Sequence, residues 1–131
     1  MSFIKIKGVI PPMITPFDEN DMADYEKHIH NIKKWNQYDL AGYLVLGSNS
    51  ETVYLNEEEK LELIRLTVEN RAEGKLVMVG TGMESTRETI TLTNKAAALG
   101  ADCALIVTLF YYGGKMNDEA LIAYYTDVAD K

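Results

Sequence analysis

The sequence holds a single cysteine, Cys103, among its 131 residues, and only three prolines. One cysteine excludes an intramolecular disulfide, and a reducing compartment is the simplest setting for such a chain. Basic residues are also scarce, because 13 lysines and arginines stand against 20 acidic residues, for a formal charge of -7. This acidic balance argues against nucleic acid or an anionic membrane as a partner, since both need a basic face.

Long apolar runs are missing as well. No stretch approaches the length of a membrane span, and residues 1–7 lack the apolar run of a signal peptide. With 47% hydrophobic and 25% charged residues, the composition is that of an ordinary globular protein. We therefore expect a cytoplasmic chain with one domain over residues 1–131.

The sequence does contain a regular alternation of apolar runs and helical patterns. The runs that predict strands are residues 9–14, 43–46, 76–79 and 104–108. Pro11 and Pro12 keep the first run extended but weaken its hydrogen-bond ladder. Apolar strands separated by helices are typical of an α/β fold with a parallel sheet covered on both faces.

Each helical pattern opens on a residue suited to an N-cap, namely Asp24, Asn56, Ser85 and Asn117. Spacing predicts buried helix faces formed by Tyr25, Ile29, Ile32 and Trp35, by Leu61, Ile64 and Val68, by Leu92, Ala96 and Leu99, and by Leu121, Tyr124, Tyr125 and Val128. The acidic run 57–59 predicts a solvated helix start. Helix lysines such as Lys60 are expected at the surface. Cys103 is expected in the core.

Four βα units fit two architectures. One is a doubly wound open sheet, and the other is half of an eightfold barrel, whose complete form takes ~250 residues. The periodicity of apolar residues alone does not distinguish these two architectures. A flavodoxin-like sheet needs a phosphate loop after its first strand, and the Thr-Pro-Phe-Asp sequence at residues 15–18 is poorly suited to that.

Both architectures bind ligands where strands end and helices begin. After the second strand, the small and hydroxylated residues 47–52 offer N–H, hydroxyl and amide groups to a carboxylate or phosphate. A polar turn whose side chains bond their own backbone is the alternative. After the third strand, Gly80 and Gly82 lack the third glycine of a dinucleotide fingerprint and indicate a tight turn.

After the fourth strand, Tyr111 and Tyr112 precede two glycines. A phenol placed there could relay a proton, or the rings could pack at a rim or a subunit contact. The loops hold no cluster of Cys, His and carboxylates, so we expect no metal, and no cofactor. None of the ten lysines lies in a strand, where burial could prepare an amine for Schiff-base chemistry.

Together these loops resemble the dihydrodipicolinate synthase and N-acetylneuraminate lyase family. Residues 8–17 resemble its first strand, 47–51 its pyruvate-carboxylate loop, 80–86 its third strand and following helix, and 107–112 the end of its fourth strand. Within the family, the Ser48-Asn49 pair and residues 84–86 and 111–116 resemble the 4-hydroxy-2-oxoglutarate aldolase branch most.

The resemblance implies a TIM (β/α)8 barrel in which a lysine forms a Schiff base with pyruvate or another 2-oxo acid. The chain would be its first four βα units, a half-barrel truncated before strand five. By position, Ser48 and Asn49 would bind the substrate carboxylate, and Tyr112 would be the relay tyrosine that reaches a neighbouring subunit's site. Ser50 stands where the family usually has glycine, and Leu109 where it has proline.

In the family, the Schiff-base lysine lies in strand six and a second tyrosine in strand five, so neither falls within these 131 residues. We therefore expect the N-terminal part of a lyase, inactive by itself. The alternative is a stand-alone or engineered half-barrel, a scaffold or carboxylate-binding module without catalysis. Open sheet edges and an open apolar interior predict self-association, as a homo-oligomer.

Overall fold

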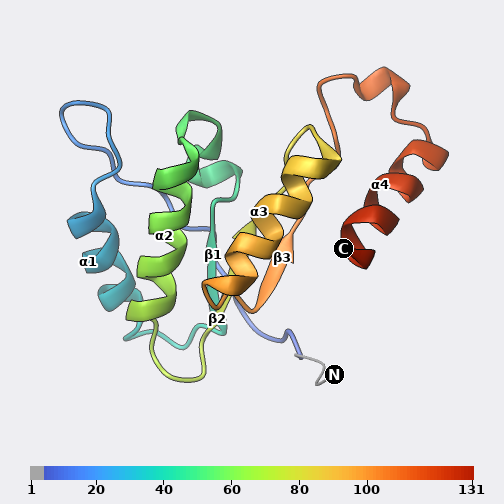
Figure 1. Cartoon of the computed structure of the whole chain (residues 1–131). Helices are drawn as coiled ribbons and strands as arrows, with labels where there is room; N and C mark the ends of the chain where they lie inside the picture. Colours follow the sequence, from blue (N-terminus) through green and yellow to red (C-terminus); the bar gives the residue numbers. More distant parts are fainter. Residues whose placement is uncertain (1–4) are drawn as a thin grey trace.

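The computed structural model describes residues 5–131 as a parallel sheet with helices packed on one face (Figure 1). The strands are β1 (Gly42–Val45), β2 (Leu76–Gly80) and β3 (Cys103–Leu105). The helices are α1 (Tyr25–Trp35), α2 (Glu57–Asn70), α3 (Thr86–Ala98) and α4 (Asp118–Asp130). Short 3-10 turns are η1 (Ser48–Ser50), η2 (Thr52–Tyr54) and η3 (Gly113–Lys115). Residues 1–4, part of the stretch considered for a signal peptide, lie outside the described residues.

The sheet has the order β1-β2-β3, and both pairings are parallel. Leu44 pairs with Met78, and Met78 pairs with Cys103. Because the strands are parallel and joined through helices, their carboxyl ends meet at one edge of the sheet. No helix of the described chain is long and apolar enough to cross a membrane.

The first predicted strand does not form a regular ladder. Residues 9–14 run beside β1 but make only an isolated bridge, from Pro12 to Leu44. Met13 N donates to Leu44 O at 2.8 Å, and Leu44 N donates to Pro11 O at 3.0 Å. Two consecutive prolines lack the N–H groups that a longer ladder needs. The weakened ladder predicted for this run is therefore observed, whereas β3 ends earlier than predicted, at Leu105.

The predicted helix starts are confirmed. Asp24, Asn56, Ser85 and Asn117 each cap a helix by accepting the N–H group three residues further on. Asn56 and Glu59 form a reciprocal capping box. Glu59 also accepts from Ala23 N at 3.2 Å and is buried, so it is not the solvated residue that the acidic run predicted.

The core lies between the sheet and helices α1 to α3. Val77 and Val79 of β2 are fully buried there, together with Leu63 and Ile64 of α2. The alternate residues of the strands point to the opposite face, where Leu105 is 47% exposed. In the part of the chain that the structure describes, no helix covers that face (Figure 1). A sheet covered on both faces, as the apolar strands predicted, is therefore not observed.

Helix α1 buries a histidine that its periodicity did not predict. His28 is 1% exposed, deeper than Tyr25 or Trp35. The Thr67 hydroxyl donates to Leu63 O at 2.7 Å, so it accepts from His28 Nε2–H, at 2.9 Å. The other ring nitrogen, Nδ1, is buried and has no hydrogen-bond partner among residues 5–131. Burial lowers the pKa of His28 from 6.5 to about 4.

This histidine should make the fold sensitive to acid. Between pH 6.5 and about 4 the unfolded chain binds a proton at His28 that the native chain does not, so stability is lost as pH falls through that window. The loss should reach ~2 kcal/mol at pH 5 relative to pH 7. His28→Leu should remove this component from urea unfolding curves, whereas His30→Gln, at an exposed position, should keep it. Equal pH dependence in wild type and His28→Leu contradicts the assignment.

Candidate functional site at the carboxyl edge of the sheet

The three loops singled out in the sequence lie at the same edge of the sheet (Figure 1). The loop after β1 contains η1 and η2, the loop after β2 spans residues 81–85, and the loop after β3 leads through η3 into α4. This is the edge at which parallel α/β proteins bind their ligands. The fold therefore brings the predicted site residues to one end of the molecule.

The loop after β1 is a tight turn with unused donors at its start. Leu46 and Glu51, which flank it, have left-handed backbone conformations with φ of 60° and 53°. Ser50 N donates to Gly47 O at 2.9 Å. The N–H groups of Ser48 and Asn49 come first in η1, and neither donates to an acceptor within residues 5–131. Both side chains are exposed, so the turn presents N–H, hydroxyl and amide groups to solvent.

Ser50 fixes the loop after β1 to the extended segment that contains Met13 and Thr15. Its side chain is 1% exposed, and its hydroxyl donates to Met13 O at 2.5 Å. In return, the Thr15 hydroxyl donates to Ser50 O at 2.8 Å. The Ser50 hydroxyl is therefore buried, and it fixes the turn to the extended segment beside β1.

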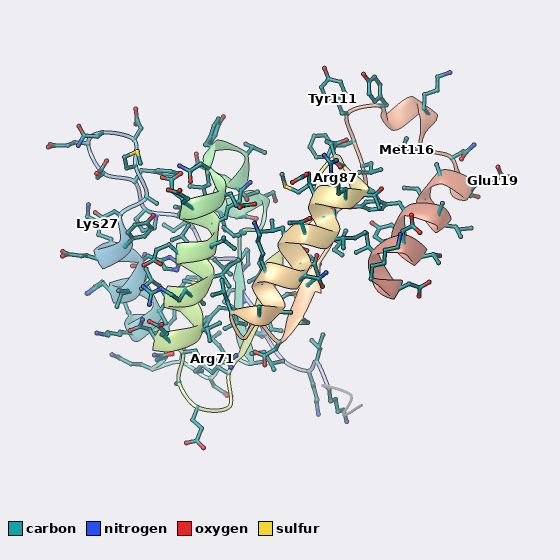
Figure 2. The ribbon with its side chains drawn as sticks, viewed as in Figure 1. Lys27, Arg71, Arg87, Tyr111, Met116 and Glu119 are labelled. Atoms are coloured by element: carbon teal, nitrogen blue, oxygen red, sulfur yellow. The ribbon has the colours of Figure 1, made fainter. Side chains whose placement is uncertain are left out.

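The tyrosine pair is exposed on the loop after β3. The rings of Tyr111 and Tyr112 pack edge to face, with centroids 4.9 Å apart, and are 73% and 69% exposed. Figure 2 shows Tyr111 beyond the N-terminal end of α3. No hydrogen bond joins this loop to Ser48 or Asn49 in the described chain. The structure therefore places Tyr112 on the same edge as the serine and asparagine, without a hydrogen bond to either within residues 5–131.

A buried hydroxyl network beneath this edge was missed in the sequence. Thr89 Oγ1 lies 3.0 Å from Met83 N, 3.1 Å from Met83 O and 3.0 Å from the Tyr124 hydroxyl. Burial raises the pKa of Tyr124, so its phenol stays protonated and can donate. A helical threonine gives no sequence signal for such a role. The predicted burial of Tyr124 was the one sequence feature that indicated part of this network.

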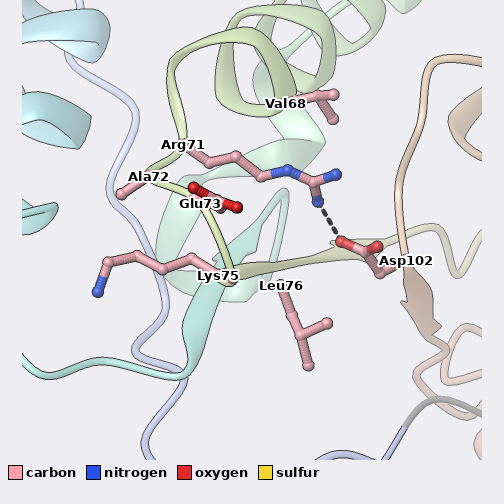
Figure 3. A pocket seen from close by; sticks show the side chains of 8 residues that line it. Val68, Arg71, Ala72, Glu73, Lys75, Leu76 and Asp102 are labelled. Atoms are coloured by element: carbon pink, nitrogen blue, oxygen red, sulfur yellow. Dashed lines mark hydrogen bonds and ion pairs between the residues drawn. The ribbon is translucent and has the colours of Figure 1, made fainter.

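A pocket at the opposite end of the sheet does not suit a ligand. It has a volume of about 400 Å³ and contains an ion pair between Arg71 and Asp102 (Figure 3). Asp102 also accepts from Val77 N at 2.8 Å, and Lys75 Nζ donates to Tyr38 O at 2.8 Å. Arg71, Lys75 and Asp102 thus have partners within the protein, and the contacts of Arg71 and Asp102 join the end of α2 to the start of β2.

A smaller pocket, of about 160 Å³, lies between α2 and α3 and contains Lys60. Lys60 is 8% exposed, so the prediction of a surface lysine was wrong. Burial lowers its pKa, and the Glu57 carboxylate opposes that shift. Cys103 is half-buried on the open face of the sheet rather than in the core, and burial raises the pKa of its thiol.

A parallel sheet with helices on one face, whose strands all end in polar loops at one edge, defines part of a βα barrel with its binding face at that edge. The chain belongs to the dihydrodipicolinate synthetase family, whose model matches residues 5–131. This confirms the resemblance noted in the sequence and identifies the fold as part of a TIM barrel.

Curated relatives and solved structures agree with this family assignment. The chain is 34% identical over 125 residues to 4-hydroxy-tetrahydrodipicolinate synthase of Oenococcus oeni, covering 95% of the chain and 42% of the relative. It is 38% identical over 133 residues to the probable mitochondrial 4-hydroxy-2-oxoglutarate aldolase of Emericella nidulans, with the same coverage. The chloride-inhibited dihydrodipicolinate synthase of Acinetobacter baumannii, solved with pyruvate, superposes with a TM-score of 0.87 at 31% identity, covering 96% of this chain and 43% of that one. The chain thus spans about two-fifths of the length of these proteins.

The loop after β1 should be sensitive to a substitution of Gly80 at the end of β2. A Cβ at this position would lie 2.2 Å from Leu46 O, at the start of the loop. Gly80→Ala should therefore destabilise the fold by ~1–3 kcal/mol and shift the amide NMR signals of Ser48 and Asn49. Gly114→Ala is the matched control, because a Cβ there has no neighbour within 4 Å. Unchanged loop amides in Gly80→Ala contradict this coupling.

Proposed function

We propose that this chain is the N-terminal part of a Schiff-base (class I) lyase or aldolase that acts on pyruvate or another 2-oxo acid. Family membership over residues 5–131 supports the proposal, together with the relative whose structure was solved with pyruvate. The observation that carries it is the pair of unused N–H groups at Ser48 and Asn49, on the edge where the fold binds ligands.

In this proposal the turn after β1 binds the carboxylate of the 2-oxo acid. Two consecutive N–H groups and the Ser48 hydroxyl can bond both carboxylate oxygens, and bonds to a charged acceptor are about twice as strong as neutral ones. The turn is held before any substrate arrives, because Ser50 fixes it to Met13 and Thr15. A rigid set of donors binds an anion with little further ordering.

Tyr112 is the proposed proton relay. An amine adds to the substrate ketone to give a carbinolamine, and loss of water then gives the imine, so the departing hydroxyl must gain a proton. A phenol can deliver that proton and take one back from solvent. The exposure of Tyr112 and its separation from Ser48 fit a role in the site of a neighbouring subunit.

The amine itself is proposed to lie outside this segment. Lys60, which is buried, lines a pocket between α2 and α3 that does not include Ser48 or Asn49. The relatives are more than twice as long as the chain, which leaves room for a lysine and a second tyrosine on later strands. The 131 residues alone should then bind a 2-oxo acid without forming a covalent adduct.

Two measurements on the 14.7 kDa chain test this. Intact mass spectrometry after incubation with pyruvate and borohydride should show no added mass. An adduct would contradict the absence of a competent amine. Titration with pyruvate should shift the amide signals of Ser48 and Asn49, and Ser48→Ala should weaken binding several-fold, since a hydrogen bond contributes ~1 kcal/mol. Asn20→Ala, at an exposed position in another loop, is the control. Absence of binding at millimolar pyruvate contradicts the carboxylate role.

We further propose that the chain self-associates through the open face of its sheet. Leu105 lies there, and Val9, Ile14 and Val107 are each more than half exposed. Exposed apolar side chains and unpaired strand edges favour association with a second copy. Sedimentation velocity at micromolar concentration should show a dimer or a larger species. Leu105→Glu should weaken it, and Ile122→Glu, on the exposed side of α4, should not. A stable wild-type monomer contradicts the proposal.

A further inference from the structure

Residues 109–115, which contain Tyr111 and Tyr112, are called the tyrosine loop below. One carboxylate from the neighbouring βα unit holds the backbone of this loop. Glu84 Oε1 accepts from Phe110 N and Oε2 accepts from Tyr111 N, both at 3.1 Å. Both oxygens of a single side chain are thus used on two consecutive N–H groups. Glu84 directly precedes Ser85, the N-cap of α3. This contact joins the loop after β2 to the residues that immediately precede Tyr112.

Glu84 itself extends from a firmly anchored loop. The adjoining residue, Met83, is bonded through both its N–H and its carbonyl to the buried Thr89 hydroxyl, which also contacts Tyr124 of α4. Gly82 lies so close to the segment after β3 that a Cβ would be 2.9 Å from Val107 N. The loop is therefore fixed to α3, α4 and the continuation of β3, and it offers the carboxylate a rigid base.

The tyrosine loop has few other restraints. Its own hydrogen bonds are local, from Gly113 N to Phe110 O at 3.1 Å and from Lys115 N to Tyr112 O at 2.7 Å. Residues 109–115 contain no proline, so no ring restricts φ in this segment. An external anchor is then needed to limit the conformations of this segment.

We propose that Glu84 is a positioning residue that fixes the backbone of Phe110 and Tyr111 and thereby sets the direction in which Tyr112 enters the substrate site. The inference rests on the proposed relay role of Tyr112. Glu84 itself does not touch the substrate.

Two readouts on the intact chain, both taken without substrate, test the proposal. Hydrogen exchange should be at least ten-fold faster at the Phe110 and Tyr111 amides in Glu84→Ala. It should be intermediate in Glu84→Gln, which keeps one acceptor oxygen. In chain labelled with 3-fluorotyrosine, the Tyr112 resonance, assigned with Tyr112→Phe, should shift toward its position in unfolded chain in the same order.

The matched control is Glu88→Gln, which removes an equal charge from the first turn of α3, where Glu88 pairs with Arg87. It should leave both readouts at wild-type values. Wild-type exchange in Glu84→Ala, or equal acceleration in Glu88→Gln, overturns the positioning role. Neither readout depends on pyruvate binding or on an adduct, so failure of the proposed function would be seen in other experiments than failure of this inference.

Discussion

The arrangement of the candidate site depends on strand β2, which bonds in parallel to both neighbours. Its residues Val77 and Val79 are fully buried under the helices, and its register with β1 and β3 sets where all three strands end. Asp102 secures the other end of this strand by accepting from Val77 N while it pairs with Arg71 at the end of α2. A shift of β2 by one residue would turn its buried valines to the open face and separate the loops that carry Ser48, Glu84 and Tyr112.

Features that depend on local geometry could be predicted from the sequence. Each N-cap acts on an N–H group three residues away, so Asp24 and Asn117 were recognisable from their neighbours alone. The weak first strand was foreseeable for the same reason, since Pro11 and Pro12 lack donors wherever they lie. The order of the loops was also sufficient to suggest the family, which the match over residues 5–131 confirms.

Features that depend on contacts distant in sequence could not be predicted. His28 can be buried because Thr67, from another helix, accepts a hydrogen bond from its Nε2–H. Glu59 can be buried because it accepts one from Ala23 N. Neither hydrogen bond produces a periodic pattern in the sequence from which it could be predicted. The pairing of Glu84 with Phe110 and Tyr111 is of the same kind, and in the sequence Glu84 was only a polar residue before a helix cap. Sequence patterns therefore located the candidate site but not the contacts that hold it.

The two parts of the proposed site differ in how much they rely on the rest of a barrel. The turn that contains Ser48 and Asn49 is fixed by Ser50, Met13 and Thr15, all within the first βα unit and its own strand segment. Its donors are thus in place in a segment that spans about two-fifths of its relatives. Tyr112 is held by a contact between separate units, and its hydroxyl has no hydrogen-bond partner among residues 5–131. If the proposed roles hold, carboxylate binding therefore depends on contacts within one unit, whereas proton relay depends on the contact between two units and on an amine outside this segment.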